Sequence, residues 1–205
     1  MSHRFPRHRG EWRRQYNMRV TPATTPYRAR FTRMDESTAE EWAAMLAMED
    51  EEVSALPDRL LAQLRLLDNE HGGFAVDRLT HSLQTTHRAE ADGREDAYLV
   101  CALLHDVGDV LGPLNHADIA AAILKPWVTE AYHFMVLEHG VFQGYYFWHY
   151  VGGDRDARDE FRGHEHYDLT EEFVRCYDMP SFDPEYATPP LEHYEPMLRS
   201  FFSRP

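Results

Sequence analysis

Residues 97–108 read AYLVCALLHDVG, an apolar run that ends in a histidine, an aspartate and, two residues on, a glycine. The apolar residues recur at the helical spacing i, i+3, i+4 and i+7, at Ala97, Val100, Cys101 and Leu104. An imidazole and a carboxylate on adjacent residues cannot both face a helical core. The end of this helix therefore has to present His105 and Asp106 to a shared site. A carboxylate flanked by imidazoles suits first-row metals such as iron, manganese or zinc.

Helical patterns continue on both sides of this stretch. Ser37 with Glu40 forms a capping-box pattern, and Pro57 separates the helix that follows from an apolar helix near residues 60–67. Six further helices are expected, over residues 74–90, 115–126, 126–140, 140–151, 169–177 and 191–202. No segment shows sustained β-strand alternation. The sequence predicts an all-α bundle of about six to nine helices.

The charge of the chain is unevenly distributed. Residues 1–30 carry eight arginines and one acid, whereas residues 31–205 carry 13 basic and 34 acidic side chains. Because the first segment lacks apolar periodicity, we expect a flexible basic arm over 1–30 and one domain over 31–205. The strongly acidic body argues against nucleic acid and anionic membranes as main partners, although the arm itself could bind such a partner.

The composition also bears on the compartment. No apolar run approaches the ~20 residues that cross a bilayer, and no apolar signal core stands at the N-terminus. These features predict a cytosolic protein. Cys101 and Cys176 lie in apolar, helix-like stretches, where reduced thiols are expected.

Short motifs around the His-Asp pair resemble the HD-domain superfamily. LTHSLQT (79–85) resembles its first metal histidine, LLHDVG (103–108) its signature pair and RCYD (175–178) its last aspartate. NHA (115–117) and LEHG (137–140) resemble the extra histidines of the two-metal members. The resemblance covers roughly residues 60–200 and implies an HD-domain helical bundle. The di-metal ligands that it implies are His81, His105, Asp106, His116, His139 and Asp178. Taken singly, each of these residues also has an ordinary explanation as a packed, capping or surface side chain.

Two enzyme classes follow from the resemblance. Most HD proteins resemble phosphohydrolases, in which metals activate water against a phosphoester. A smaller group resembles myo-inositol oxygenase and the phosphonate-cleaving oxygenases. Members of that group use an Fe²⁺/Fe³⁺ pair and O₂ to break a C–C or C–P bond beside a hydroxyl-bearing carbon. The stretch HSLQT (81–85) resembles the phosphonate-oxygenase version of the first motif, so we expect a di-iron oxygenase with a small organic substrate. A phosphohydrolase is the alternative, and the complete ligand set disfavours a regulatory protein with a degenerate site.

Two polar residues lie at helical spacing from the implied ligands. Gln84 is three residues beyond His81, and Arg175 is three residues before Asp178, so both are expected to face the site and bind substrate. Family relatives use arginine for the anionic group of the substrate, which a guanidinium can hold through two parallel hydrogen bonds. The alternatives are a polar helix face for Gln84 and, for Arg175, a surface ion pair with the glutamates at 171 or 172.

The chain departs from its oxygenase relatives at four positions. Where those oxygenases have a gating tyrosine and glutamate, this chain has His71 and Phe74. Asp109 stands where they often have histidine or lysine, and Gln143 stands where they have a lysine. Asp109 and Gln143 are therefore expected to line the substrate site. The pocket loses positive charge, which disfavours aminophosphonates and inositol as substrates.

Overall fold

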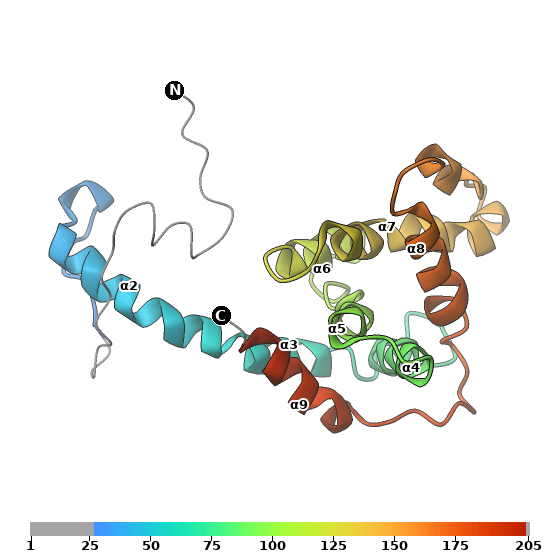
Figure 1. Ribbon diagram of the computed structural model, residues 1–205, viewed down its shortest axis with the longest axis horizontal. Helices are drawn as coiled ribbons and strands as arrows, with labels where there is room; N and C mark the ends of the chain where they lie inside the picture. The colour runs from blue at the N-terminus through green and yellow to red at the C-terminus, as the bar shows by residue number, and fades with distance from the viewer. Residues whose placement is uncertain (1–26, 204–205) are drawn as a thin grey trace. The chain divides into compact units, whose positions relative to one another are not determined.

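The computed structural model describes residues 27–203, and every regular element in this range is helical (Figure 1). The predicted all-α fold is confirmed for this part of the chain. The chain divides into two compact units, Met1–Leu56 and Pro57–Pro205. The predicted arm over 1–30 lies almost wholly outside the described residues, so its boundary stays a prediction.

From residue 27 on, the first unit contains two helical elements, η1 (Met34–Glu36) and α2 (Ala39–Ser54). Its capping box lies one residue later than predicted. The Thr38 amide donates to the Glu41 carboxylate at 3.1 Å, and the Thr38 hydroxyl accepts from the Glu41 amide at 3.3 Å. Ser37 donates its hydroxyl to the carbonyl of Met34 at 2.6 Å. Because Ser37 closes the preceding 3₁₀ turn, Thr38 is left to begin α2.

The second unit contains most of the helices. The α-helices are α3 (Leu56–Arg65), α4 (Arg78–Ala91), α5 (Asp96–Leu104), α6 (His116–Leu124), α7 (Glu130–Phe147), α8 (Tyr167–Phe173) and α9 (Leu191–Phe202). Short helical turns lie between them at η2 (Trp148–Tyr150), η3 (Ala157–Phe161) and the π-helical turn η4 (Val174–Asp178).

Helix α5 forms the centre of this unit. Every side chain from Tyr98 to Leu104 is buried, and the helix packs against α4, α7 and α9 (Figure 1). A helix without a polar face is stable only when other elements cover it on all sides. Its C-terminal end therefore delivers His105 and Asp106 into the interior rather than to the surface.

Several predicted helix boundaries were wrong, among them the start of the helix expected at Pro126, which begins at Glu130. Helix α4 begins at Arg78 rather than near residue 74, because the Asp77 carboxylate caps it by accepting from the Thr80 amide at 2.7 Å. Residues 130–147 form one helix rather than two that meet at Gly140. A glycine inside a helix costs up to about 1 kcal/mol, and the packing of α7 against α6 and α8 offsets this cost.

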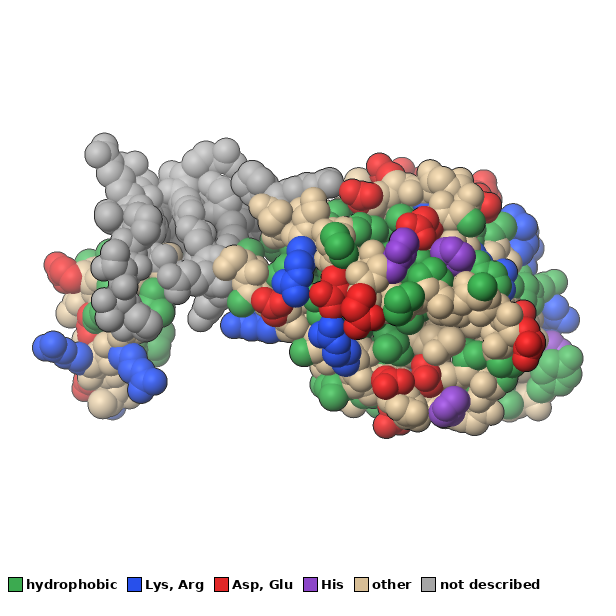
Figure 2. All heavy atoms as spheres, turned by 90° about the horizontal axis from the view of Figure 1, so that it is seen from below, with side chains coloured by type: hydrophobic (Ala, Val, Ile, Leu, Met, Phe, Trp, Pro, Cys, Tyr) green, Lys and Arg blue, Asp and Glu red, His purple; other side chains and the backbone are tan. Residues whose placement is uncertain are grey.

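The surface of the second unit carries exposed ion pairs between α3 and α9. Arg65 pairs with Glu195, and Arg199 pairs with Asp58 at 2.7 Å. Figure 2 shows acidic and basic side chains gathered together on the face viewed from below. Exposed pairs contribute about 0–1 kcal/mol each, so the buried face of α9, with Leu198 at its centre, accounts for most of its attachment.

The helices and the cysteines can be compared with the predictions about membrane spans and thiols. Within residues 27–203, no helix has both the length and the apolar character needed to cross a membrane. Cys101 is buried, Cys176 is half-buried, and both are free thiols. Burial raises the pKa of the Cys101 thiol, which keeps it protonated.

Candidate metal centre

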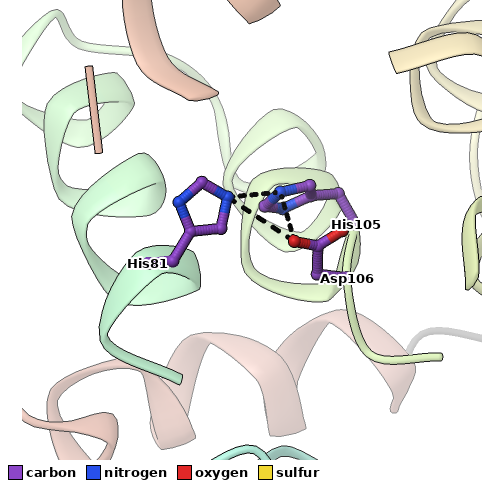
Figure 3. A group of neighbouring side chains, drawn as sticks. All are labelled: His81, His105 and Asp106. Atoms are coloured by element: carbon purple, nitrogen blue, oxygen red, sulfur yellow. Dashed lines mark hydrogen bonds and ion pairs between the residues drawn. The ribbon is translucent and has the colours of Figure 1, made fainter. Parts of the chain in front are cut away.

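The structure brings the six predicted ligands together from five segments of the second unit. The contributing elements are α4 (His81), the turn after α5 (His105 and Asp106), the start of α6 (His116), α7 (His139) and η4 (Asp178). All six side chains are buried except that of His116, which is 27% exposed. Figure 3 shows His81 projecting from its helix toward His105 and Asp106.

One half of the cluster joins His81, His105, Asp106 and Asp178. The Nε2 atoms of His81 and His105 lie 3.2 Å apart, and Asp106 Oδ2 lies 3.5 Å from the first and 3.4 Å from the second (Figure 3). Asp178 Oδ1 lies 3.1 Å from His81 Nε2 and 3.8 Å from His105 Nε2. His81, His105 and Asp106 form one compact group of possible ligand atoms, and Asp178 lies near both histidines. We call this set of four residues half-site 1.

The other half joins the second oxygen of Asp106 to His116 and His139. Asp106 Oδ1 lies 3.3 Å from the Nε2 atom of each histidine, and these two Nε2 atoms are 3.4 Å apart. We call this set half-site 2. Because the two oxygens of Asp106 face different histidine pairs, its carboxylate has the placement of a bridge between two metal positions.

Backbone carbonyls determine which ring nitrogen of each histidine faces the cluster. The Nδ1 atoms of His81, His105 and His139 lie 2.9, 2.7 and 2.7 Å from the carbonyl oxygens of residues 181, 102 and 136. That of His116 lies 3.5 Å from the Pro113 carbonyl. A carbonyl accepts only from a protonated Nδ1, so Nε2 is the ring nitrogen that is left to face the cluster, and it presents a lone pair once its own proton is lost. Metal-ligating histidines are oriented in this way.

The distances between the possible ligand atoms suit coordination to a shared metal ion better than direct hydrogen bonds between these atoms. Two ligands about 2.1 Å from one ion at the tetrahedral angle are about 3.4 Å apart, which matches the spacings above. Asp106 Oδ1 and Asp178 Oδ2 are buried without a hydrogen-bond partner among the described residues. Buried carboxylate oxygens require a nearby positive charge. The cluster could therefore hold metal ions.

Protons on two histidines balance part of this charge when no metal is bound. Burial favours neutral imidazole at His139, but the Asp106 carboxylate outweighs it and raises the pKa of His139 to about 9. At His81, burial is likewise outweighed by Asp178, and the pKa is raised. Burial prevails at His105 and lowers its pKa to about 4. A metal ion has to replace the protons, so its binding is coupled to proton release.

Gly108 allows half-site 2 to form beside the His-Asp pair. A Cβ atom at this position would lie 2.7 Å from the carbonyl oxygen of His116 and 2.8 Å from the Cβ of Ile119. Only a residue without a side chain tolerates such an approach. The glycine thus lets the start of α6 reach the end of α5, and it places His116 next to Asp106.

A strap of three residues, 181–183, holds His81 in place. The Ser181 carbonyl accepts from His81 Nδ1, and the Phe182 ring stacks on the His81 ring at 4.3 Å between centroids. Gln84 donates from Nε2 to the carbonyl of Asp183 at 2.7 Å and accepts from its amide at 3.2 Å. Gln84 is buried, and both ends of its amide are engaged by the strap. The prediction that Gln84 binds substrate stays a prediction, and the contact that the structure shows is with the strap beside His81.

We expect Gln84→Ala to weaken metal binding at half-site 1 and to leave half-site 2 nearly unchanged. Loss of a group that orients a ligand typically costs 10–100-fold in metal affinity, and we expect roughly that range. A competition titration with a chromogenic chelator measures the change. His87→Ala is the matched control, since His87 lies on the same helix and contacts Tyr186 at 3.0 Å, outside the strap. Equal metal affinities in the two variants would show that the strap does not position His81.

The predicted substrate residues Gln143 and Asp109 lie beside the cluster, but each is engaged by another side chain. Gln143 donates to Asp178 Oδ1 at 2.7 Å and so orients a ligand. Asp109 is 5% exposed, with Oδ2 2.5 Å from Nε of Arg78. Burial and the nearby Asp106 raise the pKa of Asp109. Asp109 Oδ1 lies 3.6 Å from Nδ1 of His116.

Arg175 pairs with Glu171 and makes no ion pair with a cluster residue among the described residues, so its predicted role in substrate binding stays a prediction. Its side chain is 54% exposed, and Nε donates to the Glu171 carboxylate at 3.2 Å. The surface ion pair is thus the alternative that the structure shows. The physical reason is η4, because the wider turn of a π-helix changes the angle between residues three apart.

Sequence reasoning missed three residues around the cluster. Arg78 precedes His81 by three residues on α4, a helical spacing that could have indicated its position near the site. Ser181 and Phe182 carry no motif, and only the folded chain brings them to a histidine 100 residues earlier.

No protein-family model matches this chain, and no curated protein matches it. The fold and the cluster alone define the class, an all-α protein whose buried histidines and aspartates could hold metal ions.

Proposed function

We propose that this chain is an HD-domain di-iron oxygenase. It uses O₂ to cleave a C–P or C–C bond beside a hydroxyl-bearing carbon of a small, phosphonate-like molecule. The observation that carries the proposal is the two-sided placement of Asp106, whose oxygens lie 3.3–3.5 Å from two separate histidine pairs. Such a carboxylate serves two metal ions rather than one. The resemblance of HSLQT (81–85) to the phosphonate-oxygenase motif supports the choice of iron and O₂.

The two half-sites differ in ways that suit different tasks. Half-site 1 has four protein ligands and is fully buried, whereas half-site 2 has three and includes the partly exposed His116. A catalytic metal site keeps positions open for substrate. Half-site 2 is therefore the half at which a substrate hydroxyl binds. When bound, the iron pair supplies chelation of this hydroxyl and activation of O₂.

The surrounding side chains hold the ligands and exclude water. Gln143 keeps Asp178 turned toward half-site 1, and the Phe182 ring covers one face of His81. The Arg78–Asp109 pair lies next to His116 with its charges balanced. A substrate at half-site 2 therefore meets a neutral ion pair at this side rather than a free carboxylate, which is compatible with a substrate that carries an anionic group.

Oxygen consumption tests the proposal against a metal-dependent phosphohydrolase. The iron-loaded, partly oxidised protein should take up O₂ in a screen of hydroxyphosphonates and polyols, and zinc-loaded protein should not. His116→Ala should abolish the uptake, because it removes a ligand from half-site 2. The same imidazole and carboxylate ligands could instead activate water. Anaerobic release of phosphate from phosphoesters, with manganese or zinc as effective as iron, would establish that function in place of the oxygenase.

A further inference from the structure

Tyr145, near the end of α7, lies between two arginine side chains. The guanidinium carbons of Arg155 and Arg158 lie over its ring, 4.2 and 3.7 Å from the centroid. Two guanidinium groups this close to one centroid would overlap on the same face, so they lie on opposite faces of the ring. Each contact is a favourable cation–π interaction, and together they hold two like charges at a fixed separation.

The two arginines lack the partners that buried guanidinium groups usually have. Their Nε atoms are buried and have no hydrogen-bond partner among the described residues. Arg155 makes no ion pair within this part of the chain. Arg158, whose side chain is 12% exposed, approaches Glu171 only to 4.0 Å. The same glutamate is bonded to Arg175 at 3.2 Å. Arg158 and Arg175 therefore share one carboxylate, and Arg155 has none in the described part of the chain, so three positive charges face one negative charge.

The acidic residues near these arginines in sequence do not supply the missing charge. Asp159 pairs with Arg162 at 2.9 Å, and the Asp154 carboxylate accepts from the Asp156 amide at 2.9 Å. Neither carboxylate pairs with Arg155 or Arg158 in the described part of the chain. Buried guanidinium Nε atoms without a partner are unusual, and here they occur in a chain whose net charge is −14.

We propose that Arg155 and Arg158, held apart by Tyr145, form a binding site for a doubly charged oxyanion such as a phosphate or phosphonate group. A guanidinium presents its donors as a planar fork that matches a phosphate edge. An oxyanion at the edge of the ring lies within reach of both forks. A phosphate group carries a charge of about −1.5 to −2 at neutral pH, which balances the excess. The site includes none of the metal ligands, so it stands independently of the proposed oxygenase activity.

Calorimetric titration of the full chain with inorganic phosphate tests the proposal. We expect one phosphate per chain, with the affinity reduced roughly tenfold or more in Arg158→Gln, because a charge-assisted bidentate contact is lost. Arg162→Gln is the matched control, since this arginine lies in the same segment and is already paired with Asp159. His116→Ala should leave phosphate binding unchanged, which separates this site from phosphate bound at a metal.

The outcomes separate a binding site from a structural contact. Helical circular dichroism establishes that each variant is folded, and Arg155→Lys provides a milder second variant that keeps the charge and loses the fork. Weaker binding in both arginine variants, with Arg162→Gln unchanged, supports the site. Absence of phosphate binding in the unaltered chain, unchanged affinity in the folded variants, or loss of binding in His116→Ala would each overturn it.

Discussion

The Asp106→Ala variant should remain helical and lose both metal ions. Each Asp106 oxygen lies 3.3–3.5 Å from a different pair of histidines, so removal of the carboxylate takes a ligand from both half-sites at once. It also leaves His139 without the carboxylate that raises its pKa. The helices should persist because the core of α5, from Tyr98 to Leu104, does not depend on this side chain. Elemental analysis together with circular dichroism measures both effects.

Asp178→Ala is the comparison that makes this result specific. Asp178 lies near the histidines of half-site 1, and Gln143 is its only hydrogen-bond donor from α7 among the described residues. Its removal should lower the metal content toward one ion per chain rather than toward none. If Asp106→Ala kept a magnetically coupled metal pair in EPR, or if both variants lost metal equally, Asp106 would not be the bridge.

Gly108→Ala should destabilise the protein and empty half-site 2. The new Cβ would lie 2.7 Å from a backbone carbonyl oxygen of α6, which cannot move without displacing the helix. Forcing an extra carbon into a packed contact costs about 1–3 kcal/mol. The shift also moves His116 away from Asp106, because His116 is the first residue of α6. Urea denaturation measures the free energy of unfolding, and elemental analysis of the same sample measures the metal content.

Gly140→Ala provides a matched glycine control in the same unit. Gly140 follows the ligand His139 directly, and a Cβ atom there would meet nothing within 4 Å. Alanine is favoured over glycine inside a helix by up to about 1 kcal/mol, so this variant should be as stable as the unaltered chain or more so, with its metal content unchanged. Equal stability of the two variants would show that the approach of α6 to Gly108 is not the constraint inferred here.

The cluster of histidines and aspartates could be predicted because its signals are local. His105 and Asp106 follow an apolar helix directly, and helix periodicity on its own places such a pair at a helix end. The remaining four ligands carry short motifs that resemble one superfamily, and the structure brings all six side chains together. The all-α fold was predictable for the same reason, since the periodicity of apolar residues is contained in each segment separately.

The roles of the residues around the ligands were harder to predict, because they depend on segments distant in sequence. Gln84 lies on the expected helix, yet the backbone of Asp183 occupies its amide. Asp109 lies beside the cluster, yet Arg78 neutralises its charge. In each case the residue that occupies the side chain cannot be identified from the local sequence pattern.

Sequence alone determined which residue types could bind metal and which helices carry them, because helix periodicity and adjacent ligands are properties of short segments. Tertiary structure decided how those helices are rotated and what covers them. The π-helical turn at 174–178 directs Arg175 to Glu171 instead of the cluster. The strap at 181–183 turns His81 toward Asp106 and Asp178. Both depend on hydrogen bonds and packing between segments, whose partners are determined only when the chain has folded.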